Sequence, residues 1–275
     1  TFKRQLDFFQ KEYGFLSKED YINAIKNRIN IKGAVLTFDD GLRDHYKHVL
    51  PELQKRNLWG TFYVSSGVYK ERKILAVHRV HLLKGKYGAD IILKKLTEII
   101  DDTMIDNTKM EVFDKEIYQG INYDASERSL KGLLNYYIKY QHLDGLLDEL
   151  MKTFFDEKTL FDDIYLTKKE IIELKESGNI IGSHSVTHKV LSRLSYFDQM
   201  NEIKDSFDFI DSIVSQSYKS FCYPYGYKSS YNINTLEILE KLSIDEACVF
   251  DNKLQSDNFS NLELSRIDCN NFLNV

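Results

Sequence analysis

The chain has 275 residues, of which 43% are hydrophobic and 29% charged, and its formal net charge is −5. This length accommodates one large domain or two small ones, and the composition excludes disorder and low-complexity sequence. The acidic balance argues against a nucleic-acid partner, which would need a basic face.

The sequence gives little indication of a membrane segment or of disulfide bonds. No apolar run approaches the roughly 18 residues that span a bilayer, so we expect no transmembrane segment, and no signal peptide is visible. Because the chain starts at Thr1, the compartment stays open: we expect a soluble protein, either cytoplasmic or associated with the cell envelope. Its three cysteines, Cys222, Cys248 and Cys269, lack both disulfide and metal-ligand patterns. None of these features indicates an oligomeric state.

The first predicted elements are two short helices. Apolar residues with helical spacing run over residues 6–13 and again over 21–25. Ser17 and Asp20 resemble a helix start signal before the second run.

A strand–helix–strand pattern follows. The run GAVLTF, residues 33–38, is short, apolar and β-rich, which predicts a buried strand. Residues 44–57 predict a helix, and GTFYVSS, residues 60–66, predicts a second strand. This order is typical of a right-handed βαβ unit in a parallel sheet.

The pattern then changes from about residue 77 to 161. Three segments, residues 90–100, 129–140 and 146–155, have helical periodicity, and no clear strand lies among them. We therefore expect a single domain over residues 1–275, with residues 77–161 as a helical insertion.

Alternation of helix and strand resumes at Leu166. Thr167 and Glu170 form a capping-box pattern, and Gly178 lies where a left-handed residue would end the helix. Residues 179–181 predict a strand, 195–216 a helix, and 219–226 a strand that runs into a turn, which are further elements of an α/β fold.

Polar clusters follow three of these strands. They are Asp39 with Asp40, His184 with His188, and the YPYG turn at residues 223–226. In an α/β barrel the loops after the strands open on one face, so we expect these clusters to become neighbours. An isolated acidic pair is typical of a solvated turn and an isolated histidine pair is usually incidental, but their joint occurrence after strands favours a metal site.

The spacing of the two histidines predicts that both bind the same metal ion. On a helical turn, His184 and His188 would point the same way and bind one cation. Two histidines, one carboxylate and an open fourth position suit catalytic zinc. Such an ion polarises a carbonyl and lowers the pKa of bound water to about 7. The second carboxylate is then free to accept the proton.

These motifs resemble a known family. TFDDG at 37–41, HSVTH at 184–188 followed by LSRLS, and YPYG look like the first three motifs of NodB-type polysaccharide deacetylases, in the same order. The resemblance covers roughly residues 1–75 and 160–270. It implies a distorted (β/α) TIM-like barrel and a divalent-metal-dependent hydrolase that removes N-acetyl groups from an amino-sugar-containing carbohydrate.

The resemblance also implies roles for individual residues. Asp40, His184 and His188 would hold the ion, with zinc expected and cobalt, nickel or iron as alternatives. Asp39 would be the general base, and the backbone N–H of Tyr225 would stabilise an oxyanion.

One departure from the family pattern concerns the base. Many members have an arginine in the third motif that orients it, whereas this chain has Cys222. Arg266, in LSRID, is predicted to replace that arginine from another loop.

A second departure concerns the general acid, because no histidine follows His188. The alternatives are a chain that continues past Val275, a different protonating group, or a weak catalyst. His78 and His81 would serve if the insertion folded over the site; otherwise they are ordinary helix-surface histidines.

Other functions stay open beside N-deacetylation. The same water chemistry serves an O-acetyl esterase or another amidase. A catalytically silent sugar-binding homologue would keep the fold and the metal. Polymer, lipid-linked sugar and small glycoside all present the same acetamide group, so the sequence does not choose among them.

Overall fold

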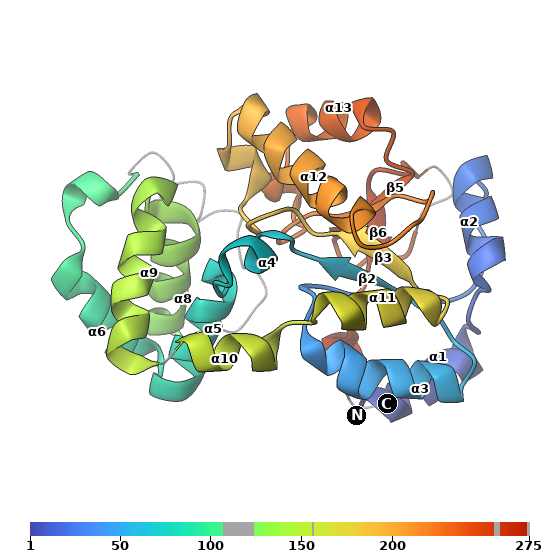
Figure 1. The fold of residues 1–275 in the computed structure, drawn as a ribbon, viewed down its shortest axis with the longest axis horizontal. Coiled ribbons are helices and arrows are strands. Elements are labelled where there is room, and N and C mark those ends of the chain that lie inside the picture. The colour runs from blue at the N-terminus through green and yellow to red at the C-terminus, as the bar shows by residue number, and fades with distance from the viewer. Residues whose placement is uncertain (107–123, 156, 256–258, 274–275) are drawn as a thin grey trace. The chain divides into compact units, whose positions relative to one another are not determined.

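The computed structural model describes residues 1–106, 124–155, 157–255 and 259–273 (Figure 1). The chain divides into two compact units, Thr1–Lys70 with Asp162–Val275 and Glu71–Phe161, which we call the barrel unit and the helical unit. This division does not decide whether the chain is a single domain with an insertion at residues 77–161, which stays a prediction. Among the described residues, no helix has the length and apolar character needed to cross a bilayer.

The barrel unit is built on a parallel sheet of six strands, which lie side by side in chain order. The strands are β1 (Leu36–Phe38), β2 (Gly60–Val64), β3 (Ile180–Ser183), β4 (Ser220–Cys222), β5 (Glu246–Phe250) and β6 (Leu264–Arg266). Because all of them run in the same direction, the polar residues that follow them emerge at one end of the sheet.

The sheet is curled, so that its two edge strands approach each other. Arg266, the last residue of β6, donates a hydrogen bond of 3.1 Å from Nη1 to Oγ1 of Thr37 in β1. A curled parallel sheet with helices in its connections is a distorted (β/α) barrel, which confirms the predicted fold class.

Helices lie before, between and after the strands of the barrel unit. They are α1 (Phe2–Glu12), α2 (Lys18–Asn27), η1 (His45–Val49), α3 (Leu50–Lys55), α4 (Gly67–Glu71), α10 (Glu157–Ile164), α11 (Lys168–Glu176), η5 (Leu191–Arg193), α12 (Tyr196–Asp211), η6 (Lys228–Ser230), α13 (Ile233–Lys241) and η7 (Cys269–Phe272), of which α4 and α10 run across the unit boundary. The predicted capping box at Thr167 is confirmed at the start of α11. Figure 1 shows α12 beside α13, and the two helices are in contact.

One helix is shorter than predicted. The apolar spacing predicted a helix to residue 216, but α12 ends at Asp211. Val214 is nevertheless buried, because its N–H donates to the carbonyl of Ile210 in a turn that keeps the side chain against the core. Burial of an apolar residue therefore did not require that the helix continue.

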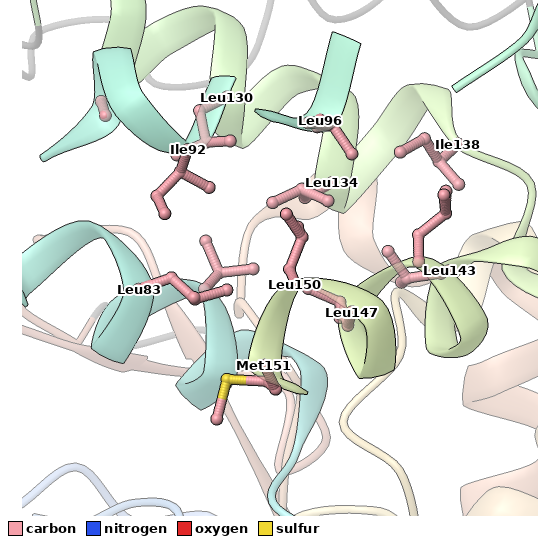
Figure 2. Packing of buried hydrophobic residues seen from close by; sticks show 13 residues of the cluster. Leu83, Ile92, Leu96, Leu130, Leu134, Ile138, Leu143, Leu147, Leu150 and Met151 are labelled. Carbon is pink, nitrogen blue, oxygen red and sulfur yellow. The ribbon is translucent and has the colours of Figure 1, made fainter. Parts of the chain in front are cut away.

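The helical unit has its own apolar core. Its described elements are α5 (Ala76–Tyr87), α6 (Ala89–Ile99), η2 (Asp102–Met104), α8 (Ala125–Gly132), η4 (Leu133–Tyr137) and α9 (Tyr140–Phe154). Figure 2 shows leucine and isoleucine side chains from these helices pointing toward one another, among them Leu83, Leu96 and Leu147, each 0% exposed. Amphipathic helices thus bury their apolar faces against one another here.

A fully buried acid lies at the start of β5 in the barrel unit. Glu246 is 0% exposed, and its carboxylate accepts hydrogen bonds from the hydroxyls of Tyr218 at 2.8 Å, Ser220 at 2.7 Å and Tyr21. Burial raises the pKa of Glu246 above its ordinary value, and the three hydroxyl donors only partly offset this effect.

Candidate metal and catalytic site

The acidic pair lies in the turn after β1. Asp40 and Gly41 have left-handed backbone conformations, with φ of 75° and 65°. The carbonyl of Gly41 accepts a 2.9 Å hydrogen bond from the N–H of Leu166, which holds the turn. The turn sends the two carboxylates to different partners, Asp39 to Arg266 and Asp40 to the two histidines.

His184 and His188 lie in an irregular loop after β3. The prediction that they share a helical turn is wrong, because Ser185 and His188 have φ of 61° and 57°. These left-handed residues bend the chain back on itself, and the two imidazole centroids lie 4.7 Å apart with an interplanar angle of 78°. The predicted proximity is therefore present, although the backbone achieves it differently.

The three predicted ligands converge. Oδ1 of Asp40 lies 3.5 Å from Nε2 of His184 and 3.5 Å from Nε2 of His188, and all three atoms lie within 4.8 Å of one another. Two ligands about 2.1 Å from a tetrahedral ion lie about 3.4 Å apart. The observed separations therefore suit a single divalent cation.

The tautomer of His184 is also suitable for a ligand. Its Nδ1 lies 2.7 Å from the backbone carbonyl oxygen of Cys222. Because a carbonyl only accepts hydrogen bonds, Nδ1 carries a proton, which leaves Nε2 for an ion. A backbone carbonyl in this position is a common partner of metal-binding histidines.

Asp39 is held by Arg266. Nη1 and Nη2 of Arg266 donate to Oδ1 and Oδ2 of Asp39 at 2.7 and 2.9 Å, a bidentate pair. Burial raises the pKa of Asp39, but the charge of Arg266 and the hydrogen bonds from Arg266 together hold it below its ordinary value. Asp39 is therefore ionised at neutral pH.

Cys222 completes this arrangement. It is 0% exposed, and its Sγ lies 3.0 Å from Nη2 of Arg266 and 3.6 Å from Oδ2 of Asp39. Burial raises the pKa of the Cys222 thiol well above its ordinary value, so the thiol is neutral. A small neutral side chain here leaves room for the guanidinium of Arg266.

Tyr225 lies in the turn after β4. Its φ is 64° and that of Gly226 is 70°, and the carbonyl of Gly226 accepts a 2.9 Å hydrogen bond from the N–H of Phe250. The ring of Tyr225 lies edge-on to that of His188, with centroids 5.0 Å apart. The structure therefore places Tyr225 next to the ligand cluster.

His78 and His81 belong to α5 of the helical unit. His81 is exposed, as expected for a helix-surface residue, but His78 is only 9% exposed. The helix-surface interpretation is therefore wrong for His78, because its side chain is buried.

Sequence reasoning missed one polar residue beside the site. Glu202 on α12 is 9% exposed and contacts the loop that carries the two histidines. A signal was present, because Gln199, Glu202 and Ser206 recur at helical spacing along the apolar stripe of Ile203 and Ile210. Polar residues within a buried stripe indicate specific partners.

A curled parallel sheet with polar side chains at the carboxyl ends of its strands is the architecture of (β/α)-barrel enzymes. The sequence matches the model of the polysaccharide deacetylase family over residues 26–96 and 146–247, and the chain belongs to that family.

Solved structures show the same fold. The deacetylase PplD of Streptococcus pyogenes, solved in complex with acetate, is 21% identical with a TM-score of 0.56, over 96% of this chain and 76% of that one. The deacetylase domain of BpsB from Bordetella bronchiseptica is 13% identical with a TM-score of 0.54, over 97% and 83%. A de-N-acetylase from Aggregatibacter actinomycetemcomitans is 13% identical with a TM-score of 0.50, over 94% and 80%. No curated protein sequence matches the chain.

Proposed function

We propose that this protein is a divalent-metal-dependent hydrolase that removes N-acetyl groups from an amino-sugar-containing carbohydrate. The observation that carries the proposal is the convergence of Asp40, His184 and His188 beside an aspartate that is paired with an arginine. Membership in the polysaccharide deacetylase family supports the same reaction class.

Asp40, His184 and His188 would hold the ion, which is zinc in this proposal, although cobalt, nickel and iron accept the same ligand set. When bound, such an ion acts as a Lewis acid on a carbonyl oxygen and makes water more acidic. The backbone carbonyl of Cys222 supports this arrangement, since it keeps the proton of His184 on Nδ1.

Asp39 is the base in this proposal. Its ionised carboxylate accepts the proton of the attacking water, and Arg266 holds both oxygens in a fixed plane. The N–H of Tyr225 is proposed to donate to the oxyanion that forms from the acetyl carbonyl. The cleaved products would be acetate and a free amino sugar.

The experiment combines metal analysis with an acetate assay. The purified protein should contain about one divalent ion per chain, and His184→Ala and His188→Ala should lower that content to background. Asp39→Asn should keep the metal but release acetate at least about 100-fold more slowly. A wild-type metal content at background would contradict the proposal.

The substrate class is tested on matched compounds. Acetate release from N-acetylhexosamine oligomers and from O-acetylated sugars of the same length separates the N-deacetylase from an O-acetyl esterase. One further candidate is a sugar-binding homologue without catalysis, because Cys222 stands where many members of the family have an arginine. That candidate predicts binding of metal and sugar with no acetate release from either series.

A further inference from the structure

Glu202 is a buried acid that none of the roles above uses. It lies on α12, the helix that follows the histidine loop, and it is 9% exposed. A carboxylate with so little access to water requires hydrogen-bond donors from the protein.

All of its described donors come from two residues of the histidine loop. Oε2 of Glu202 accepts hydrogen bonds from the backbone N–H groups of Val186 at 3.0 Å and Thr187 at 2.8 Å. Oε1 accepts one from the hydroxyl of Thr187. Such charge-assisted bonds are stronger than neutral ones. The carboxylate and the loop conformation therefore stabilise each other.

The loop is also held from the side of β2. The N–H groups of Ser66 and Gly67 donate to the carbonyls of Ser185 and Val186 at 3.1 and 2.9 Å. The N–H and C=O groups of Val186 are thus bound on opposite sides, by Glu202 and by Gly67. Contacts of this kind are what keep non-glycine residues in left-handed conformations.

Two left-handed residues flank the contacts made by Glu202. They are Ser185, which is 0% exposed, and the candidate ligand His188. The hydroxyl of Ser185 accepts a 3.1 Å hydrogen bond from the N–H of His188. Without the carboxylate of Glu202, the N–H groups of Val186 and Thr187 would lose their acceptor. The segment between Ser185 and His188 would then relax. The imidazole of His188 would then leave its position beside Asp40.

We propose that Glu202 is a positioning residue that holds loop residues 185–188 in the conformation that brings His184 and His188 to Asp40. This inference rests on the proposed function for the role of the two histidines as ligands. Glu202 itself touches neither the ion nor the substrate in this proposal.

The test uses Glu202→Met, which keeps the length of the side chain and removes both acceptors, whereas a glutamine oxygen could still accept from both N–H groups. We expect the dissociation constant for Co²⁺, measured by calorimetric titration of the metal-stripped chain, to rise about 10–100-fold. Amide hydrogen exchange at Val186 and Thr187 should also be faster. Asp205→Asn, an exposed acid on the same helix, is the matched control and should change neither quantity.

Thr187→Val provides a second variant in case Glu202→Met does not fold. It removes only the hydroxyl donor, so a smaller loss of Co²⁺ affinity is expected. An affinity within twofold of wild type in the folded Met variant, or in the Val variant if the first does not fold, would overturn the proposal.

Failure of the proposed function has a different signature. If the wild-type chain bound no Co²⁺, the metal-dependent reaction would be refuted. Exchange at Val186 and Thr187 would then decide the positioning role by itself: faster exchange in Glu202→Met would support it and unchanged exchange would overturn it.

Discussion

Arg266 and Asp39 form a bidentate ion pair that joins the two edges of the curled sheet, with N–O distances of 2.7 and 2.9 Å. Arg266 ends β6 and Asp39 follows β1, so the pair links the last strand of the sheet to the first. The side chains are 17% and 31% exposed, which leaves the carboxylate reachable from solvent while its orientation is set by the guanidinium.

We expect Arg266→Lys to slow acetate release by roughly 10–100-fold, because an ammonium group cannot make two parallel bonds to one carboxylate and the base would lose its orientation. Metal content should be unchanged, since Arg266 touches none of the three candidate ligands in its described hydrogen bonds. Steady-state kinetics and metal analysis on the same preparation check both statements. An unchanged rate in Arg266→Ala would refute the role of Arg266.

Replacing Cys222 by arginine should be tolerated only if Arg266 is replaced by cysteine in the same chain. Cys222→Arg alone places a second guanidinium in a fully buried position beside Arg266, and we expect a loss of folded protein through crowding and charge repulsion. Adding Arg266→Cys should restore folding and part of the activity, because one guanidinium again faces Asp39. Yield of folded protein and acetate release measure the rescue. A double variant no better than Cys222→Arg would contradict this expectation.

Glu246 should make stability depend on pH. Its pKa is raised in the folded chain, mainly by burial, so the folded state binds the proton more tightly than the unfolded state. Its contribution is fully present below the ordinary carboxyl pKa and is lost as pH rises toward the raised value. The slope is at most about 1.4 kcal/mol per pH unit.

Glu246→Gln removes this titration while keeping the shape of the side chain. The free energy of unfolding of the variant, relative to wild type, should therefore increase as pH rises from about 4.5 toward neutrality. Urea unfolding at a series of pH values gives this difference. A difference that stays constant over that range would show that Glu246 does not titrate differently in the two states.

Gly67 should be intolerant of a side chain. A Cβ there would lie 2.6 Å from the carbonyl oxygen of Val186, so Gly67→Ala would push the histidine loop away from the start of α4. We expect a lower free energy of unfolding by about 1–3 kcal/mol and weaker metal binding. Chemical denaturation and Co²⁺ titration check the two effects.

Gly145→Ala is the control for that substitution. Gly145 lies inside α9, and a Cβ there would meet nothing within 4 Å. The change should raise the stability of the helical unit by about 0.5–1 kcal/mol, because alanine favours a helix interior. Equal destabilisation by the two substitutions would argue against a specific role for the close approach at Gly67.

The amino-acid sequence by itself indicated strands β1 to β4 and the residue types of the site, but no strand after residue 226. The apolar run before Asp39 and the capping box at Thr167 are local patterns, and local patterns fix where a strand or helix forms. Asp40 and His188 each follow a strand in the sequence. Because parallel strands share one direction, this order also placed both residues at the same end of the sheet.

Only the tertiary structure decided how those residues are held. The left-handed bends at Ser185 and His188 come from contacts with β2 and with Glu202, and nothing in the five letters of HSVTH specifies them. The contact of Arg266 with Asp39 joins residues 227 positions apart, and its geometry depends on how far the sheet curls. Curling results from the packing of the whole barrel, which no short stretch of sequence encodes.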